Sequence, residues 1–423
     1  MYKITHANIK DWAKNYTGEP FDGILCDPPY ELGFMGKSWD SSGIAFDKDM
    51  WSDLLRILKP GGHLLAFSGS RTYHRMAVAI EDAGFEIRDM IEWVYGSGFP
   101  KSLNIGKAVD KLNGASNRGH AISSGSKIHP TTGKPRANGE LLPAYKARTE
   151  AGQLWEGYGT ALKPAHEPCV LARKPLSEKS VAENCLKWGT GGINIDESRV
   201  ETSDKLQVLH GSFTFSGGQG ADMKGKTIEF IDSGLGRFPA NLIHDGSDEV
   251  EAVFPSNKST KTKAHDNRTN TGSSMFIDGV HNPENSYSDG GSASRFFYTA
   301  KANKRERNAG LEGFEEKEKS GSYEFRTDGS LDGKATQAKA NFHPTVKPLS
   351  LTKYLATLIK PPTGGRLLVP FSGSGSEMIG ALQAGWEYVE GVELTEEYIP
   401  IAEARIKYWL EKLEEESKQV SLI

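Results

Sequence analysis

Phe21-Asp22-Gly23-Ile24-Leu25-Cys26-Asp27-Pro28-Pro29-Tyr30 joins a short apolar run to a stiff turn, and this junction predicts an α/β fold. The apolar run predicts a buried strand that ends at Asp27. Two consecutive prolines lack backbone N–H donors and fix φ, so this segment cannot continue a central strand. We therefore expect Asp27 and Tyr30 at the carboxyl edge of a sheet, where open α/β sheets bind ligands.

Short apolar runs alternate with helical patterns on both sides of this junction. The pattern predicts strands at 63–67, 86–95, 168–172, 366–369 and 386–392. It predicts helices at 50–58, 72–83, 349–359, 377–384 and 396–413, a turn at 59–62 and a frayed end at 414–423. This β-α-β order is typical of a largely parallel sheet with helices on its faces.

The middle of the chain has a different composition. Residues from about 101 to 340 are rich in Gly, Ser, Asn, Thr and Lys, with weak periodicity and loop-like stretches at 256–274 and 320–340. Loops of this length in a compact domain are usually functional or mobile. We predict one α/β domain that is interrupted by a large insert.

The charge of the chain is unevenly distributed. The net charge is −4, but residues 99–179 carry thirteen Lys/Arg against six Asp/Glu. A second basic cluster contains Lys301, Lys304, Arg305 and Arg307. Basic stripes of this kind neutralise phosphates or form a solvated loop surface, and the sequence leaves both readings open.

Cysteine usage and the N-terminus favour a reducing cytoplasm. Cys26, Cys169 and Cys185 are far apart and form neither a disulfide framework nor a metal-ligand pattern. We expect no metal site and interpret all three as buried small hydrophobic residues. We also find no signal-peptide core and no apolar run that could cross a bilayer, so no membrane association is expected.

The Asp27–Tyr30 turn has the groups needed to activate an aromatic amine. Such an amine is a poor nucleophile because its lone pair is delocalised into the ring. A carboxylate from Asp27 and the carbonyl of Pro28 can accept hydrogen bonds from one NH₂ and draw its nitrogen toward tetrahedral geometry. Tyr30 offers a flat face for a base, and such stacking contributes about 1–3 kcal/mol. A rigid exposed turn is the alternative interpretation.

A second motif, Phe371-Ser372-Gly373-Ser374-Gly375, stands between a predicted strand and a predicted helix. Glycines at such a turn let the backbone approach a ligand closely. Glu393 ends the next predicted strand, where an acid can hydrogen-bond a ribose diol. The third glycine of a dinucleotide fingerprint is missing, which argues against an oxidoreductase.

With both motifs, the chain resembles the amino-methyltransferases of DNA from bacteria and phages. Asp-Pro-Pro-Tyr is the catalytic motif of that family and Phe-x-Gly-x-Gly is its cofactor motif. Here the catalytic motif comes first, which is the order of the beta class and argues against RNA or protein-glutamine methyltransferases. Further similar stretches are 33–40, 58–62, 71–74, 95–101, 161–168, 295–308 and 343–348. The similarity weakens at about 200–290 and 315–340.

The resemblance implies an S-adenosyl-L-methionine-dependent methyltransferase fold, a Rossmann-like seven-stranded mixed sheet with helices on both faces. It implies a catalytic half at residues 1–180 with a basic loop region at about 101–160, a target-recognition insert at 181–340, and a cofactor-binding half at 341–423. The implied catalytic residues are Asp27, Pro28, Pro29 and Tyr30. The implied cofactor-binding residues are Phe371, Ser372, Gly373, Ser374, Gly375, Ser376, Glu393, Asn8, His343, Thr345 and Lys347.

Within that set, the resemblance assigns Lys347 to the carboxylate of the cofactor and Asn8 to the vicinity of its adenine. Two residues depart from the family pattern: Val369 replaces an Asp, and Glu377 replaces a small hydroxyl residue. The missing carboxylate predicts one fewer polar contact to the cofactor. Glu377 at a helix N-terminus is electrostatically favourable and could attract a sulfonium.

The implied reaction is transfer of the methyl group to the exocyclic N6 of adenine in double-stranded DNA, on a base flipped out of the helix. Adenine is favoured over the N4 of cytosine because cytosine enzymes more often have Ser in place of Asp27. An inactive DNA-binding homologue is a more distant alternative. We expect a monomer or homodimer, with a restriction endonuclease as a candidate partner.

Overall fold

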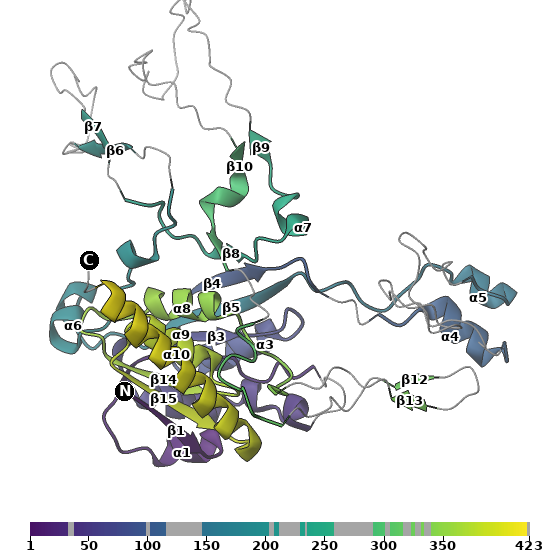
Figure 1. Ribbon diagram of the computed structural model, residues 1–423, viewed down its shortest axis with the longest axis horizontal. Coiled ribbons are helices and arrows are strands. Elements are labelled where there is room, and N and C mark those ends of the chain that lie inside the picture. Colours follow the sequence, from purple (N-terminus) through teal and green to yellow (C-terminus); the bar gives the residue numbers. More distant parts are fainter. Residues whose placement is uncertain are drawn as a thin grey trace, which may run out of the picture.

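The computed structural model describes residues 1–32, 38–98, 102–115, 146–202, 207–210, 229–232, 235–257, 291–300, 305–315, 323–325, 331–333 and 340–420 (Figure 1). Much of the predicted basic loop region, at 116–145, lies outside the described residues. So do Lys301 and Lys304 of the second basic cluster, residues 33–37 of the first similar stretch, and most of both loop-like stretches.

A mixed nine-stranded sheet forms the centre of the described structure. Its strands, in spatial order, are β1 (Tyr2–His6), β15 (Tyr388–Glu393), β14 (Arg366–Pro370), β2 (Phe21–Cys26), β3 (Leu58–Phe67), β5 (His166–Arg173), β4 (Glu86–Val94), β8 (Leu242–His244) and β11 (Tyr298–Thr299). All neighbours are parallel except β5, which is antiparallel to both β3 and β4.

Helices cover both faces of this sheet. Successive strand residues point to opposite sides, and in the central strands the residues on both sides are apolar. In β2, Leu25 belongs to one hydrophobic cluster, whereas Ile24 and Cys26 belong to the other. One cluster includes side chains of α8 (Leu349–Leu358), α9 (Ser376–Gln383) and α10 (Ile399–Val420). The other includes side chains of α1 (Ile9–Asn15), α2 (Lys48–Arg56) and α3 (Tyr73–Asp82).

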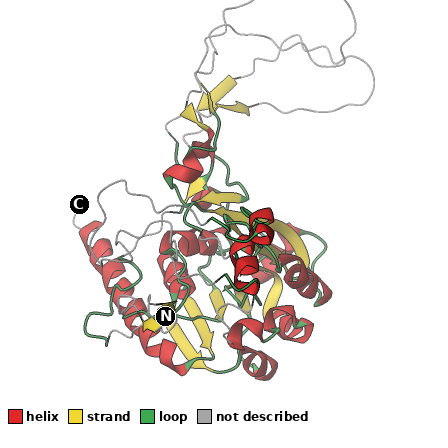
Figure 2. Ribbon diagram, turned by 90° about the vertical axis from the view of Figure 1, so that its right-hand side faces the viewer, coloured by secondary structure: helices red, strands yellow, loops and turns green. Residues whose placement is uncertain are grey.

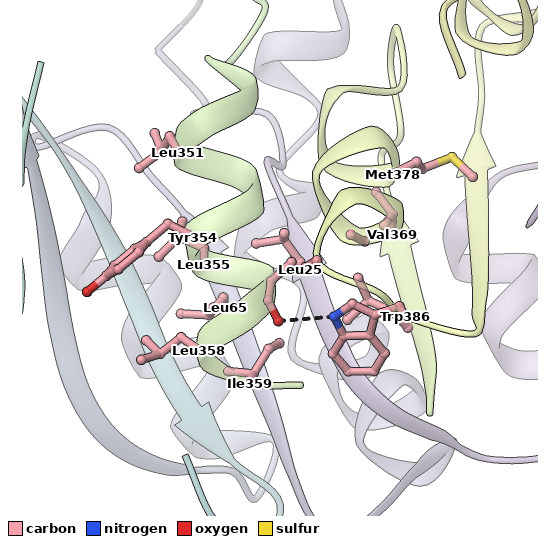
Figure 3. Packing of buried hydrophobic residues seen from close by; sticks show 14 of the residues in the cluster. Leu25, Leu65, Leu351, Tyr354, Leu355, Leu358, Ile359, Val369, Met378 and Trp386 are labelled. Atoms are coloured by element: carbon pink, nitrogen blue, oxygen red, sulfur yellow. Dashed lines mark hydrogen bonds between the residues drawn. The ribbon is translucent and has the colours of Figure 1, made fainter. Parts of the chain in front are cut away.

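The α8–α9 face is closely packed against the central strands. Figure 3 shows Leu355 of α8 beside Leu25 and Leu65 of the sheet, with Leu351 one turn further along the helix. Trp386 packs at one end of this cluster and donates its indole N–H to the carbonyl of Ala356 over 3.0 Å. This packing fixes the helix that follows the glycine motif.

The remaining elements lie outside the main sheet. The other helices are α4 (Ile105–Leu112), α5 (Glu150–Leu154), α6 (Val181–Trp188) and α7 (Asp248–Glu251), with 3-10 turns at Ser38–Ser41, Ile44–Phe46, Asp196–Ser198, Ala293–Phe296 and Glu396–Tyr398. Three small antiparallel sheets pair β6 (Gln207–His210) with β7 (Glu229–Asp232), β9 (Ser256–Asn257) with β10 (Gly291–Ser292), and β12 (Tyr323–Phe325) with β13 (Leu331–Gly333). The β6–β7 and β9–β10 pairs project away from the sheet (Figures 1 and 2).

The predicted α/β fold with helices on both faces is confirmed, but the predicted number of strands is wrong. The sheet has nine strands rather than seven, because β8 and β11 extend it beyond β4. Both added strands come from the segment 181–340, which we predicted to be a separate insert. The domain boundaries themselves stay a prediction.

Several local predictions need correction. The turn predicted at 59–62 is part of β3, where the strand bulges: Phe21 pairs with Leu58, and Gly23 already pairs with His63. The last helix continues to Val420 although we predicted fraying from 414. Cys26 and Cys169 are buried, as predicted, whereas Cys185 is only half-buried. Among the described residues, no helix combines the length and apolar character needed to span a bilayer.

Candidate active site

Asp27–Tyr30 and the glycine motif meet at one edge of the sheet. β2 and β14 are adjacent parallel strands, with Leu367 beside Gly23 and Leu368 beside Ile24. Asp27 directly follows β2 and Phe371 directly follows β14. The carboxyl ends of two adjacent parallel strands therefore place the two motifs side by side, as the sequence predicted.

β5 brings a third segment to this edge because it runs antiparallel to its neighbours. Its second residue, Glu167, accepts a hydrogen bond from the hydroxyl of Tyr30 over 2.8 Å. The ammonium of Lys347 lies 2.6 Å from Asp27 Oδ2, 3.0 Å from the Tyr30 hydroxyl and 3.2 Å from Glu167 Oε2. We call these four residues, Asp27, Tyr30, Glu167 and Lys347, the Lys347 cluster.

The Lys347 cluster is a desolvated charge network. Burial by itself lowers the pKa of Lys347, but the carboxylates of Asp27 and Glu167 outweigh this effect and raise its pKa. Burial also raises the pKa of Tyr30 well above its ordinary value, so its hydroxyl stays protonated. Asp27 Oδ1 is buried and has no hydrogen-bond partner. One carboxylate oxygen of the motif is thus held and the other is left for a ligand.

The backbone of Tyr30 is also anchored. The hydroxyl of Thr72, just before α3, donates to the carbonyl of Tyr30 over 2.7 Å. The Lys347 ammonium lies 5.3 Å from the centre of the Tyr30 ring and 4.7 Å from that of Phe67. Thr72 therefore holds the backbone of the motif, and Lys347, in the segment before α8, lies against its aromatic ring.

The glycine motif forms a turn of left-handed backbone conformations. Phe371, Gly373 and Gly375 have φ values of +60°, +50° and +82°. The side chain of Phe371 makes its conformation unusual for a residue with a Cβ atom. A Cβ added to Gly373 would lie 2.8 Å from His343 Nε2, so this position requires glycine for space as well as for conformation.

Glu393 closes this turn from the neighbouring strand. Its Oε2 accepts from the N–H of Gly373 over 2.7 Å, and its Oε1 accepts from the N–H of Thr395 over 2.8 Å. Burial raises the pKa of Glu393, while these backbone donors act in the opposite direction. Each carboxylate oxygen retains a second lone pair, which can accept from a ribose hydroxyl.

Arg405 of α10 supports the glycine turn by hydrogen bonds to Ser374 and Ser376. It was not predicted as a site residue. It is fully buried, and one guanidinium nitrogen donates to the carbonyl of Ser374, to Ser374 Oγ and to Ser376 Oγ over 2.5, 3.0 and 3.2 Å. Burial lowers the pKa of Arg405 to about 10. The helical periodicity of α10 was the available signal, since Ile401, Ala402 and Ile406 line the same buried face.

The remaining predicted cofactor residues lie around this turn. The ring of His343 packs edge-on to Tyr398 at 4.6 Å, and its Nδ1 contacts the carbonyl of Thr345. Burial lowers the pKa of His343 to about 4, so it is neutral at physiological pH. Asn8 caps α1 by accepting from the N–H of Lys10 over 3.0 Å, and the preceding residue, Ala7, donates to the carbonyl of Glu393.

Both departures from the family pattern are buried beside the site. Val369 packs into the α8–α9 cluster and adds no polar group there (Figure 3). Glu377, in the first turn of α9, has its pKa raised to about 7 by burial and by the charge of Asp27. This coupling places Glu377 within electrostatic reach of the Lys347 cluster.

Two further residues lie beside the site. Arg307 is half-buried and donates to the carbonyl of His343, so it supports the segment that contains His343. Glu167 was included only in the similar stretch 161–168, although its position next to the predicted strand at 168–172 was a signal. Among the described residues, no group of three His, Cys, Asp or Glu side chains could hold a metal ion.

The sequence of this chain is similar to those of known proteins. The DNA methylase family matches residues 21–404. The chain belongs to this DNA methylase family. Type II methyltransferase M.HindIII of Haemophilus influenzae is 23% identical over 171 residues, which are 38% of this chain and 44% of that protein. The match thus spans less than half the length of this relative.

Two solved structures are similar at low identity. The M1.HpyAVI–SAM complex is 14% identical, with a TM-score of 0.39, and the alignment covers 96% of this chain and 99% of that one. PvuII DNA methyltransferase (cytosine-N4-specific) is 11% identical, with a TM-score of 0.41, and the alignment covers 96% of this chain and 87% of that one.

Membership of this DNA methylase family implies S-adenosyl-L-methionine as the cofactor, and the residues present fit it. Asp27 Oδ1 after β2 and Ser372 Oγ in the glycine turn are among the buried oxygens of the described residues that lack a protein partner. Such orphaned groups are costly unless a ligand satisfies them. Glu393 supplies acceptors for a ribose, and the negative charges of Asp27 and Glu167 favour a cation nearby.

Proposed function

We propose that this protein transfers the methyl group of S-adenosyl-L-methionine to the exocyclic N6 of adenine in double-stranded DNA. The observation that carries the proposal is the juxtaposition of Asp27 and the glycine turn at the ends of the adjacent strands β2 and β14. It places both an acceptor for an amine and a turn for the methyl donor at one edge of the sheet.

In the proposed mechanism, a flipped adenine places its amine between Asp27 Oδ1 and the carbonyl of Pro28. These two acceptors each take one N–H and orient the nitrogen lone pair away from the ring plane. Tyr30 offers its ring for stacking and holds its hydroxyl against Glu167, over 2.8 Å, which fixes the position of the hydroxyl end of the ring. When bound, the cofactor supplies an electrophilic methyl group. Alignment of two bound reactants supplies much of the rate acceleration.

Adenine is proposed over cytosine because Asp27 stands where cytosine-N4 enzymes more often have Ser. Both bases carry an exocyclic amine that fits the same pair of acceptors, so the N4 of cytosine is the second candidate. The cytosine-N4 specificity in the name of the PvuII relative belongs to that protein. The third candidate is an inactive homologue that still binds DNA.

The partners form part of the same proposal. Duplex DNA is the substrate, the cytoplasm is the location, and a restriction endonuclease remains a predicted partner. Phosphate contacts come from the basic region between residues 99 and 179, of which Lys107, Lys111, Lys146 and Arg148 lie in or beside α4 and α5. Lys163, just before β5, donates to the carbonyl of Gly96.

The test is to express the chain in cells that lack DNA amino-methylation, digest their DNA to nucleosides, and identify the modified base by mass spectrometry. We expect N6-methyldeoxyadenosine, and its absence from cells that express Asp27→Ala at the same level. N4-methyldeoxycytidine would transfer the proposal to cytosine. Absence of both products, with retained DNA binding, would favour the inactive homologue. Sequencing the modified positions gives the recognition site.

A further inference from the structure

The contacts of Lys347 indicate a role that differs from the one the resemblance implies. We propose that Lys347, together with Glu167, is a positioning residue for the catalytic motif: it holds Asp27 Oδ2 and the Tyr30 hydroxyl, so that Asp27 Oδ1 is left to receive the amine of the base. In this role Lys347 is not a ligand of the cofactor carboxylate. The inference rests on the proposed function.

The number of hydrogen-bond donors is the first argument. A lysine ammonium has three N–H groups and no acceptor. Three acceptors surround Lys347 Nζ, namely Asp27 Oδ2, the Tyr30 hydroxyl and Glu167 Oε2, at 2.6, 3.0 and 3.2 Å. Two of the N–H groups donate hydrogen bonds, to Asp27 Oδ2 and to the Tyr30 hydroxyl, and Glu167 forms an ion pair with the same ammonium. A cofactor carboxylate would have to enter among three protein acceptors that already surround Lys347 Nζ.

The state of Asp27 is the second argument. Its side chain is largely buried, with 14% of its surface exposed, and its two oxygens differ. Oδ2 is bound to Lys347, whereas Oδ1 is buried without a partner. A buried carboxylate oxygen without a donor is unfavourable, and an N–H from a bound amine would satisfy it. The lysine thus determines which oxygen meets the base.

The fixed position of Lys347 is the third argument. The residue directly precedes Pro348, the N-cap of α8, and α8 packs into the core along its length. Its side chain is 7% exposed and lies near the rings of Tyr30 and Phe67. Lys347 therefore has little freedom to turn toward another ligand, and it transmits this rigidity to Asp27 and Tyr30.

The role of Glu167 follows from charge. Without Glu167, the ammonium would keep Asp27 Oδ2 but lose its second carboxylate, and the Tyr30 hydroxyl would lose its acceptor. Glu167 comes from β5, so the cluster joins the end of β2, the start of β5 and the segment before α8. Three elements that are distant in sequence thereby fix one carboxylate and one ring.

The experiment separates the two roles with S-adenosyl-L-homocysteine, the neutral product that retains the carboxylate of the methyl donor. Lys347→Met, Lys347→Arg, Glu167→Gln and the matched control Lys353→Met, an exposed lysine on α8, are compared with the wild type. Calorimetry gives the Kd for S-adenosyl-L-homocysteine, and single-turnover methylation of DNA at saturating cofactor gives the rate. Thermal unfolding checks that each variant folds.

If Lys347 positions the motif, Lys347→Met loses about 100-fold or more in single-turnover rate. Its Kd for S-adenosyl-L-homocysteine then changes by less than about threefold. Lys347→Arg, which retains the charge, recovers part of the rate, and Glu167→Gln loses rate without losing affinity. Lys353→Met behaves as the wild type.

Two results would overturn the inference while leaving the proposed function intact. One is a loss of S-adenosyl-L-homocysteine affinity of about tenfold or more in Lys347→Met, whatever the rate, since that places Lys347 on the cofactor carboxylate. The other is a rate within about threefold of the wild type. If Lys347→Met does not fold, the affinity criterion is applied to Lys347→Arg and the rate criterion to Glu167→Gln. A wild-type protein that methylates no DNA overturns both proposals.

Discussion

The backbone N–H of Gly373 donates to Glu393 Oε2 over 2.7 Å, so the last residue of β15 closes the turn that follows β14. The second oxygen of the same carboxylate accepts from the N–H of Thr395. Glu393 thereby joins the turn to the segment that leads into α10. One acid holds the backbone around the proposed ribose site and offers its free lone pairs to the ligand.

We expect Glu393→Ala to weaken binding of S-adenosyl-L-homocysteine by about tenfold or more, because the variant loses ribose acceptors and frees the turn. The buried N–H of Gly373 and the part-buried N–H of Thr395 also lose their partner, which costs about 1–3 kcal/mol in the free energy of unfolding. Calorimetry and urea unfolding measure the two effects. Glu396→Ala, at an exposed position in the following turn, serves as the control. Unchanged affinity in Glu393→Ala would exclude Glu393 as a cofactor ligand.

The support that Arg405 gives to the turn predicts a large effect on stability. Arg405→Met keeps much of the side-chain volume but leaves the carbonyl of Ser374 without its 2.5 Å donor. Loss of a buried network of this kind costs about 3 kcal/mol in the free energy of unfolding. Urea unfolding tests this against Lys407→Met, an exposed lysine on the same helix. Equal destabilisation by both substitutions would contradict the supporting role.

Local sequence patterns predicted those strands and helices whose own residues are buried in a regular pattern. The run Phe21–Cys26 is a strand at the predicted residues because every position in it is buried. β1 was not predicted, since its residues are only half-buried or exposed. Its place in the sheet comes from pairing with β15, nearly the whole chain away. Such an edge strand is determined by its partner more than by its own composition.

The sequence predicted the part of the site that lies directly after the strands, because the two motifs mark where those strands end. The sequence located Asp27 and Gly373 at one sheet edge, since both follow buried strands. It did not show that Lys347 meets Asp27, a contact between residues 320 positions apart, because a turn alone does not determine which carboxylate its lysine reaches. The buried state of Arg405 was indicated only by its helical spacing from Ile401, Ala402 and Ile406, since an arginine in a helix usually faces solvent.

The raised pKa of Glu377 predicts a pH-dependent stability. Its carboxyl group has a pKa of about 7 in the folded protein, against an ordinary value of 4.5, because burial and the charge of Asp27 disfavour ionisation. The folded state thus binds a proton that the unfolded state has already lost between these values. The stabilising contribution is complete below pH 4.5 and is lost as the pH rises through about 7.

Glu377→Gln, which mimics the neutral carboxyl, should remove this dependence. Relative to the wild type, the variant should gain free energy of unfolding as the pH rises from 5 to 8, by on the order of 1 kcal/mol or more. Urea unfolding at several pH values measures this difference, with Glu411→Gln on the exposed face of α10 as the control. A difference that stays constant with pH would show that Glu377 is ionised throughout.

The contact between α8 and α9 predicts an effect opposite to helix propensity. Gly380 lies inside α9, where alanine is normally favoured over glycine by about 1 kcal/mol. Here an added Cβ would lie 2.3 Å from Thr352 Oγ1 and 2.6 Å from the backbone nitrogen of Lys353. Thr352 is fully buried and its hydroxyl donates to the carbonyl of Ser376, so the two helices cannot approach this closely without glycine.

We therefore expect Gly380→Ala to lower the free energy of unfolding by about 1–3 kcal/mol, as overpacking does. Because α9 begins directly after Gly375, displacement of this helix should also weaken binding of S-adenosyl-L-homocysteine. Urea unfolding and calorimetry on the same preparation test both effects. A Gly380→Ala protein that is more stable than the wild type would mean that α8 and α9 have room to separate, and that the glycine turn does not depend on their close packing.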